Sequence, residues 1–208
     1  QDSHDVLGTY HLVSNRQEMS LIPQSPDELL KMLAYRHKIL LHARTDKNPG
    51  QFKDKNNFAG STAFVDFNLV KGTLIQSFDF YKALEHPFSR AAYMMFVLSE
   101  VHPFLDGNGR IARVMMNAVL VETEQSKIII PTVFRDDYMG ALKRLTKQGD
   151  TGPYIRMLQR AHEFSENIFG DDMEAMQDYL KQCNAFSEHT EATLKMIPRN
   201  EDFPDTSA

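Results

Sequence analysis

The sequence predicts an all-α fold that carries one small β-hairpin. Over most of the 208 residues, apolar side chains recur at spacings of three and four, the period of helices that bury one face. Turn signals that contain Gly or Pro separate these segments. Residues 51–66 lack the helical period, and within them Thr62 to Val65 are strand-forming. We therefore expect a helical bundle with a hairpin or extended loop at residues 51–66.

The composition bounds the class of protein. A hydrophobic content of 42% is enough for one core, and a net charge of −5 gives no electrostatic reason to expect nucleic acid. No apolar run is long enough to span a membrane, and the N-terminus lacks a signal pattern. Cys183 is the single cysteine, which favours a reducing compartment. We expect a cytoplasmic protein with no nucleic-acid or membrane partner.

The sequence divides into a main domain with two flanking segments. We expect an N-terminal flanking segment over residues 1–24, a main domain over 25–170, and a C-terminal helix and tail over 171–208. The breaks at 149–153 and 169–172 are too short to be domain linkers. Because the chain starts with Gln1 rather than Met and ends in a polar tail around residues 203–205, we expect a piece of a longer protein.

The first predicted helix begins at a capping box. Ser25 and Glu28 have the required spacing, and Pro26 stands at the first helical position. The helix should extend to Arg44, carried by Leu29, Leu33 and Leu40. His37 and His42 would lie on its polar side.

Six further helices follow from the same periodicity. Their expected bounds are 73–85, 88–101, 108–122, 135–147, 153–169 and 171–186. In the last one, Cys183 continues an apolar spacing set by Met173, Met176 and Leu180, so we expect a buried thiol. An exposed partner stripe is the less frequent cause of such a pattern.

Residues 102–113, which read HPFLDGNGRIAR, concentrate the chemistry of the chain. Gly107 and Gly109 allow a tight loop with positive φ and a close backbone approach to a ligand. Because a helix is expected from Asn108, its unpaired N–H groups would face that loop and attract an anion. Arg110 and Arg113 share one helix face, together with Asn117, and their guanidinium groups suit phosphate oxygens.

Two further residues of the stretch complete a reactive site. Asp106 is a hard oxygen ligand of the kind that Mg²⁺ takes when it also binds substrate phosphates. His102 ends the preceding helix, and its imidazole can accept a proton from an attacking hydroxyl. The residues therefore indicate a nucleoside triphosphate with Mg²⁺ and a general base.

The pattern H-x-F-x-[DE]-G-N-G-R-x-x-R resembles the signature of the Fic family at every specified position. The resemblance implies a helical Fic domain that transfers AMP from ATP to a Ser, Thr or Tyr hydroxyl of a protein. His102 would be the base and Asp106 the Mg²⁺ ligand. The loop Gly107–Gly109 would cradle the phosphates, and Arg110 and Arg113 would hold the β and γ phosphates.

The resemblance also implies a target-binding hairpin beside this loop. Residues 48–66 are similar to the family's flap, which binds an extended segment of the target by strand addition. Lys53 departs from the arginine that usually follows the aromatic residue there. Tyr138 resembles in position a tyrosine that borders the nucleotide, and a plain core aromatic is the equally weighted alternative. Phe104 would anchor the loop in the core.

Several alternatives stay open at this stage. Gly109 argues against the phosphorylating relatives, which resemble Fic proteins but have lysine there. Removal of AMP and a catalytically silent binding or toxin module are competing functions, and self-modification and a homo-oligomer are open as well. Glu18 and Glu191 lie in stretches similar to the family's inhibitory motif, whose glutamate pairs with the second arginine, here Arg113; both stretches lack the motif's last residue.

Overall fold

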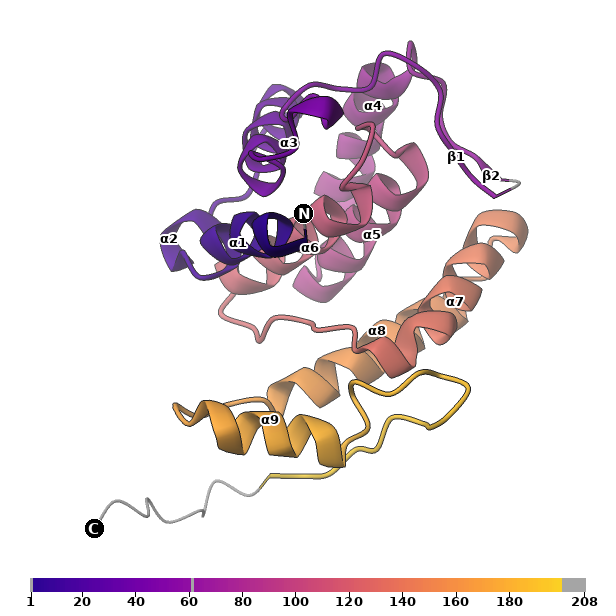
Figure 1. Cartoon of the computed structure of the whole chain (residues 1–208). Coiled ribbons are helices and arrows are strands. Elements are labelled where there is room, and N and C mark those ends of the chain that lie inside the picture. Colours follow the sequence, from indigo (N-terminus) through magenta and orange to yellow (C-terminus); the bar gives the residue numbers. More distant parts are fainter. Residues whose placement is uncertain (1, 61, 200–208) are drawn as a thin grey trace. The chain divides into compact units, whose positions relative to one another are not determined.

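The computed structural model describes residues 2–60 and 62–199 (Figure 1). The chain divides into two compact units, Gln1–Gln125 and Ser126–Ala208. The expected boundaries at 24/25 and 170/171 stay a prediction. The polar tail around residues 203–205 lies outside the described residues.

The first unit consists of helices and one hairpin, and the prediction of an all-α fold is confirmed. Its helices are α1 (Asp2–Val13), α2 (Arg16–Met19), α3 (Pro26–Leu40), α4 (Val70–Ala83), α5 (Pro87–Val101) and α6 (Asn108–Glu122), with a 3₁₀ turn at Thr45–Lys47. The predicted bounds of α6 are confirmed at both ends. Helix α3 ends at Leu40 rather than at Arg44, because the backbone leaves the helical region at Leu41, where φ is −113° and ψ is 23°.

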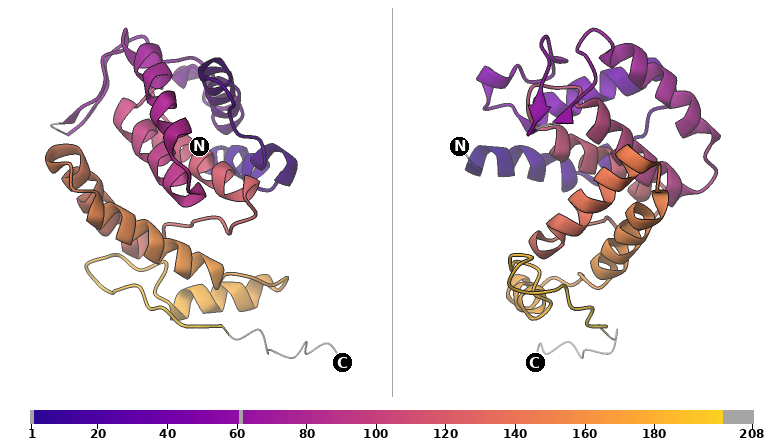
Figure 2. Two further views of the ribbon diagram at one scale, coloured as in Figure 1. Left: turned by 180° about the vertical axis from the view of Figure 1, so that it is seen from behind. Right: turned by 90° about the vertical axis from the view of Figure 1, so that its right-hand side faces the viewer.

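Helices α5 and α6 form the centre of this unit and lie side by side (Figures 1 and 2). α6 buries ten of its fifteen residues, and Arg110 and Arg113 are among the five that are not buried. A helix that is apolar on most sides is one that other helices surround. The loop that joins α5 to α6 is the motif stretch, which the two buried helices therefore hold from both ends.

The two N-terminal helices were not predicted. α1 exposes Val6 and Tyr10 but buries Leu12, so its apolar residues do not form one clear stripe. It also contains Gly8, which disfavours helices. A Cβ at Gly8 would lie 2.5 Å from the carbonyl oxygen of Leu40, so this glycine allows α1 to pack closely against α3.

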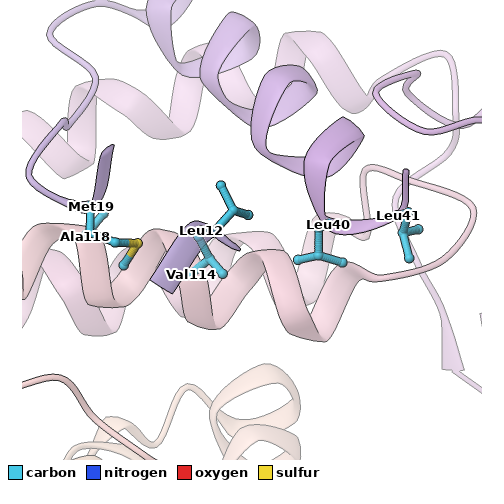
Figure 3. Close-up of a cluster of buried hydrophobic side chains, with 6 residues drawn as sticks. All are labelled: Leu12, Met19, Leu40, Leu41, Val114 and Ala118. Carbon is cyan, nitrogen blue, oxygen red and sulfur yellow. The ribbon is translucent and has the colours of Figure 1, made fainter. Parts of the chain in front are cut away.

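A cluster of buried side chains joins these N-terminal helices to the motif helix (Figure 3). Its members come from α1, α2, the end of α3 and α6: Leu12, Met19, Leu40, Leu41, Val114 and Ala118. Burial of such side chains contributes roughly 1.5–3 kcal/mol each. α6 is thus packed against α1, α2 and α3 as well as α5.

The capping box of α3 is present with one difference. The Ser25 hydroxyl accepts a hydrogen bond from the Glu28 N–H at 3.2 Å, as expected. The Glu28 carboxylate accepts from the N–H of Gln24, at 2.8 Å, instead of from Ser25. The helix start is therefore fixed to the residue before the cap.

The hairpin within residues 48–66 is short. Strands β1 (Phe58–Ala59) and β2 (Thr62–Ala63) pair in antiparallel fashion, with Phe58 opposite Ala63 and Ala59 opposite Thr62. All four residues are exposed. Figure 2 shows the hairpin extending away from the helices of its own unit. Two-residue strands are too short to be stable alone, so the hairpin depends on side-chain contacts at its base.

The second unit contains a 3₁₀ turn at Thr132–Phe134 followed by α7 (Arg135–Gln148), α8 (Thr151–Glu166) and α9 (Met173–Gln182). Cys183 is fully buried, as predicted. Met173 is 75% exposed, so the expectation that the whole stripe on α9 is core was wrong at its first residue; Tyr179 supplies the buried contact instead. Among the described residues, no helix is both long and apolar enough to cross a membrane.

Candidate active site

His102 occupies a special backbone position directly after α5. Its φ of 46° and ψ of 63° place it in the left-handed region, which costs a non-glycine residue about 1–2 kcal/mol. Its N–H caps the helix by donating to the carbonyl of Leu98. The ring nitrogen Nδ1 lies 2.6 Å from the carbonyl oxygen of Ser99. Nδ1 therefore carries the proton of the neutral ring, and Nε2 has a free lone pair.

The surroundings of His102 favour this neutral form. Burial lowers the pKa of the imidazole, the Ser99 carbonyl partly counteracts this, and the positive charge of Lys53 lowers the pKa further. A ring with a pKa below the usual 6.5 is unprotonated at neutral pH. His102 can therefore accept a proton through Nε2.

The motif loop is closed by its own side chains. Phe104 is fully buried, which confirms it as the core anchor. The Asn108 side chain accepts from the Phe104 N–H at 2.9 Å and donates to the Phe104 carbonyl at 2.8 Å. The Asn108 amide therefore shapes the loop, which leaves its backbone N–H as the group for a ligand.

His37 braces the loop from α3, and the prediction that it lies on a polar helix face was wrong. It is fully buried, and its ring stacks on Phe104 at 3.7 Å between centroids. Nδ1 accepts from the Gly50 N–H at 2.9 Å, and Nε2 donates to the Asp106 carbonyl at 3.0 Å. Burial lowers the pKa of His37 to about 4, so the ring remains neutral while it bridges residue 50 and the loop. His42, in contrast, is exposed as predicted.

The two glycines of the loop serve different purposes. Gly107 has a φ of 74°, and a Cβ there would lie 3.1 Å from Leu41. This position thus needs glycine for both conformation and space. Gly109 is helical and has no positive φ, contrary to the expectation from the sequence; a Cβ there would meet only Arg113, at 3.6 Å. Its lack of a side chain keeps the surface beside the helix start open.

Helix α6 begins at this loop without a side-chain cap. Gly107 is its N-cap residue and offers no hydrogen-bonding side chain. Uncapped N–H groups and the helix dipole together attract anions. Arg110 and Arg113 follow within the first two turns, so the positive potential extends along the helix. Asn117 is buried and does not line the same pocket.

Asp106 is the one carboxylate among the residues that line the motif pocket. It lies 3.5 Å from Arg44 and 3.8 Å from Arg110, and its Oδ1 accepts from the Gly107 N–H at 2.6 Å. Among the described residues, no group of three or more His, Cys, Asp or Glu side chains could hold a metal alone. One partly exposed carboxylate fits Mg²⁺ that is also bound by phosphates and water.

These residues surround a pocket of about 370 Å³. The pocket is lined by Asn57, Phe58, Ala59, Phe64, His102, Leu105, Asp106, Gly107, Asn108, Gly109, Arg110 and Arg113. It thus unites seven of the eight predicted site residues with four residues of the hairpin segment. Pockets of this size bind small molecules. A larger depression of about 610 Å³ beside α2 and α3 is lined by apolar and uncharged polar residues, three glutamates and one lysine, so its net negative charge does not suit an anion.

The hairpin is attached to the motif by three side chains. Lys53 is almost completely buried and donates to the carbonyl of Val101 at 3.2 Å and to the Asn57 side chain at 2.8 Å. Asn57 in turn donates to the Phe104 carbonyl at 2.9 Å. The ring of Phe64 stacks on the imidazole of His102, with centroids 3.4 Å apart and planes inclined by 10°.

Tyr138 is the predicted site residue outside the pocket lining. It is half-buried in α7 of the second unit, and its role beside a nucleotide stays a prediction. Glu18 forms an ion pair with the buried guanidinium of Arg36 at 2.9 Å and does not line the motif pocket. Glu191 is exposed in the second unit.

Sequence patterns alone did not identify His37, Asn57 and Phe64. His37 is a polar residue in an amphipathic helix, where such residues are usually solvated. Asn57 and Phe64 act through contacts with residues about forty positions away in sequence, at Phe104 and His102. The sequence offered one signal for Asn57 and Phe64, namely that the predicted hairpin contains aromatic residues and asparagines.

Comparisons with known proteins agree with this geometry. Residues 27–120 match the Fic/DOC family. The protein adenylyltransferase Fic of Drosophila persimilis is 37% identical over 84 residues, which cover 40% of this chain and 16% of that protein. The match therefore spans about a sixth of the length of the curated relative.

Solved structures show the same fold. Fic-1 (aa134–508) from C. elegans has a TM-score of 0.63 at 21% identity, over 87% of this chain and 52% of that chain. The BepC protein of Bartonella tribocorum, solved with bound AMPPNP, has a TM-score of 0.59 at 18% identity, over 77% of this chain and 83% of that chain. The chain therefore has a Fic-like fold, and its residues 27–120 are similar to the Fic/DOC family.

Proposed function

We propose that this chain is a protein adenylyltransferase that transfers AMP from Mg-ATP to a Ser, Thr or Tyr hydroxyl of a protein. The observation that carries the proposal is the single pocket in which a neutral imidazole, an uncapped helix start and two arginines converge. An anion site alone would suit many ligands, and the base adds a reactive function. The name of the Drosophila persimilis relative and the AMPPNP bound to BepC support the same chemistry.

In this mechanism the phosphates lie against the helix start. The backbone N–H groups of Asn108 and Gly109 and the guanidinium groups of Arg110 and Arg113 bind the phosphate oxygens. Asp106 would hold Mg²⁺, which supplies charge neutralisation of the phosphates when bound. These groups also stabilise the negative charge that moves onto the leaving pyrophosphate.

His102 provides the proton acceptor. As the target hydroxyl oxygen forms its bond to the α phosphorus, the bond from that phosphorus to the bridging oxygen breaks and pyrophosphate leaves. The hydroxyl proton passes to Nε2, since Nδ1 is engaged with the Ser99 carbonyl. The hairpin at 58–63 offers exposed strand edges, to which an extended target segment adds by main-chain hydrogen bonds.

The competing functions gain no support from a specific contact. For removal of AMP, Glu18, one of the two candidate inhibitory glutamates, is bound to Arg36 and lies outside the pocket lining. A silent binding module would not require His102 to be neutral and oriented. We therefore retain adenylyl transfer as the one proposal.

Mass spectrometry tests the proposal. The chain is incubated with Mg-ATP, either alone or together with a cell lysate, and the proteins are then digested to peptides and analysed. We expect a mass increase of one AMP on a Ser, Thr or Tyr of this chain or of an acceptor. The absence of AMP from every peptide, with nucleotide binding demonstrated in the same preparation, would contradict the proposal.

A further inference from the structure

The contact between Phe64 and His102 differs from the other contacts of the hairpin. Lys53 and Asn57 bind main-chain groups of the motif, whereas Phe64 touches the side chain that accepts the proton. With ring centroids 3.4 Å apart and planes inclined by 10°, the two rings are nearly parallel.

The imidazole of His102 is therefore restrained in two independent ways. The hydrogen bond from Nδ1 to Ser99 fixes which edge of the ring faces the helix end. This bond lies in the ring plane and leaves tilting of that plane possible. The stack on Phe64 covers one face and restricts the tilt, so Nε2 keeps one direction within the pocket that His102 lines.

We propose that Phe64 is a positioning residue for His102, holding the plane of the imidazole and excluding water from one of its faces. The proposal rests on the proposed function for its catalytic consequence, but its structural claim concerns the ring alone. Productive proton transfer needs the accepting atom within hydrogen-bond reach of the hydroxyl, and small misplacements reduce the rate strongly.

Phe64 itself is held in place by the hairpin stem. Its N–H lies 3.4 Å from the carbonyl oxygen of Asn57, and Asn57 is anchored to the Phe104 carbonyl and to Lys53. The stacked ring is half-buried, although Phe58 of the same hairpin is 66% exposed. Of these two aromatic side chains, Phe64 therefore contacts His102, and Phe58 lies at the surface.

Charged groups around the imidazole set the background for any titration. Lys53 approaches from the hairpin stem, Asp106 belongs to the loop, and Arg110 and Arg113 line the pocket from α6. Of these groups, Lys53 lowers the pKa of His102 through its positive charge. None of these groups changes when Phe64 is replaced by another neutral residue, so the effect of the ring can be separated from theirs.

The first test is a histidine titration by NMR without nucleotide, with the His102 signal assigned by its loss in His102→Ala. In Phe64→Leu we expect the pKa of His102 to rise by roughly half a pH unit, because water reaches the exposed face. The ring-current shift of the His102 protons should disappear. Phe64→Tyr retains the ring and should retain both properties. Phe80→Leu is the control, because Phe80 is an aromatic residue of α4 that is 66% exposed and does not line the motif pocket.

The second test is kinetic and uses the same variants. Phe64→Leu should lower kcat for AMP transfer roughly tenfold with an unchanged KM for ATP, and Phe64→Tyr should restore kcat. If thermal unfolding shows that Phe64→Leu does not fold, Phe64→Met replaces it in both tests. An unchanged His102 titration and ring-current shift in folded Phe64→Leu or Phe64→Met would overturn the proposal. A changed titration with no transfer by the native chain would support the positioning role and count against the proposed function.

Discussion

The motif loop and the hairpin segment line the same pocket but are stabilised very differently. The loop at 103–107 is mostly buried, closed by Asn108, and braced by the neutral ring of His37. The hairpin exposes all four strand residues and is attached through Lys53, Asn57 and Phe64. The core thus fixes the side of the pocket that would bind phosphate and that adjoins the proton acceptor, His102. The side that would meet a target depends on three side-chain contacts.

The largest effect should come from the fixed side. Replacement of His102 by Ala removes the proton acceptor, and general bases of this kind contribute about 10²–10⁴-fold to the rate. AMP transfer should fall by that factor while ATP affinity, measured by calorimetry, stays within about twofold, since the phosphate-binding groups are untouched. Transfer at the native rate by His102→Ala would remove the assigned role of this residue.

The pH dependence of stability should identify His37 as a brace of the loop. Its pKa is about 4 in the folded chain and 6.5 when unfolded, so the unfolded state binds a proton first as the pH falls. The free energy of unfolding should therefore decrease from pH 6.5 downwards, by about 3 kcal/mol at pH 4 from this residue alone.

Urea unfolding at several pH values measures this loss. His37→Gln should lack this part of the slope, while His42→Gln, an exposed histidine next to the end of the same helix, should retain it. His102 contributes with the same sign, because its pKa is also lowered, so a residual slope is expected in His37→Gln. A slope in His37→Gln equal to that of the native chain would contradict the bracing role.

A smaller effect on the same side is expected from Asn108→Ala. The change leaves the buried N–H of Phe104 without its acceptor, whereas the Phe104 carbonyl still accepts from Asn57. We expect a loss of about 1–3 kcal/mol in the free energy of unfolding and reduced transfer. Asn68→Ala, which removes a hydrogen bond at an exposed site, should cost less than about 0.5 kcal/mol. Equal losses in the two variants would show that the loop is no more constrained than the surface.

The motif loop and α6 were easier to predict from the sequence than the contacts of the hairpin. The bounds of α6 and the loop residues followed from local rules, namely helical periodicity and the glycines. The brace at His37 did not, because whether a polar residue is buried depends on the partners that the fold brings to it. The stack of Phe64 on His102 and the helices α1 and α2 likewise depend on long-range packing, as the close approach at Gly8 illustrates.

The smallest effect on stability should appear at the hairpin. Phe58 is 66% exposed, so Phe58→Ala should change the free energy of unfolding by less than about 0.5 kcal/mol. Because Phe58 lines the pocket mouth with the strand edge, the KM for a protein acceptor should rise while the KM for ATP stays unchanged. Destabilisation comparable to that of Asn108→Ala would mean that the hairpin is as much a part of the core as the loop.

The most direct test of adenylyl transfer follows the α and γ phosphates of ATP separately. The chain and its acceptors are incubated with Mg²⁺ and ATP that carries radiolabel on either the α or the γ phosphate, and the label retained on protein is measured. We expect retention of the α label, none of the γ label, and release of pyrophosphate in equal amount. Retention of the γ label, or of neither label under conditions in which ATP is bound, would contradict the assignment of His102 and the α6 start to adenylyl transfer.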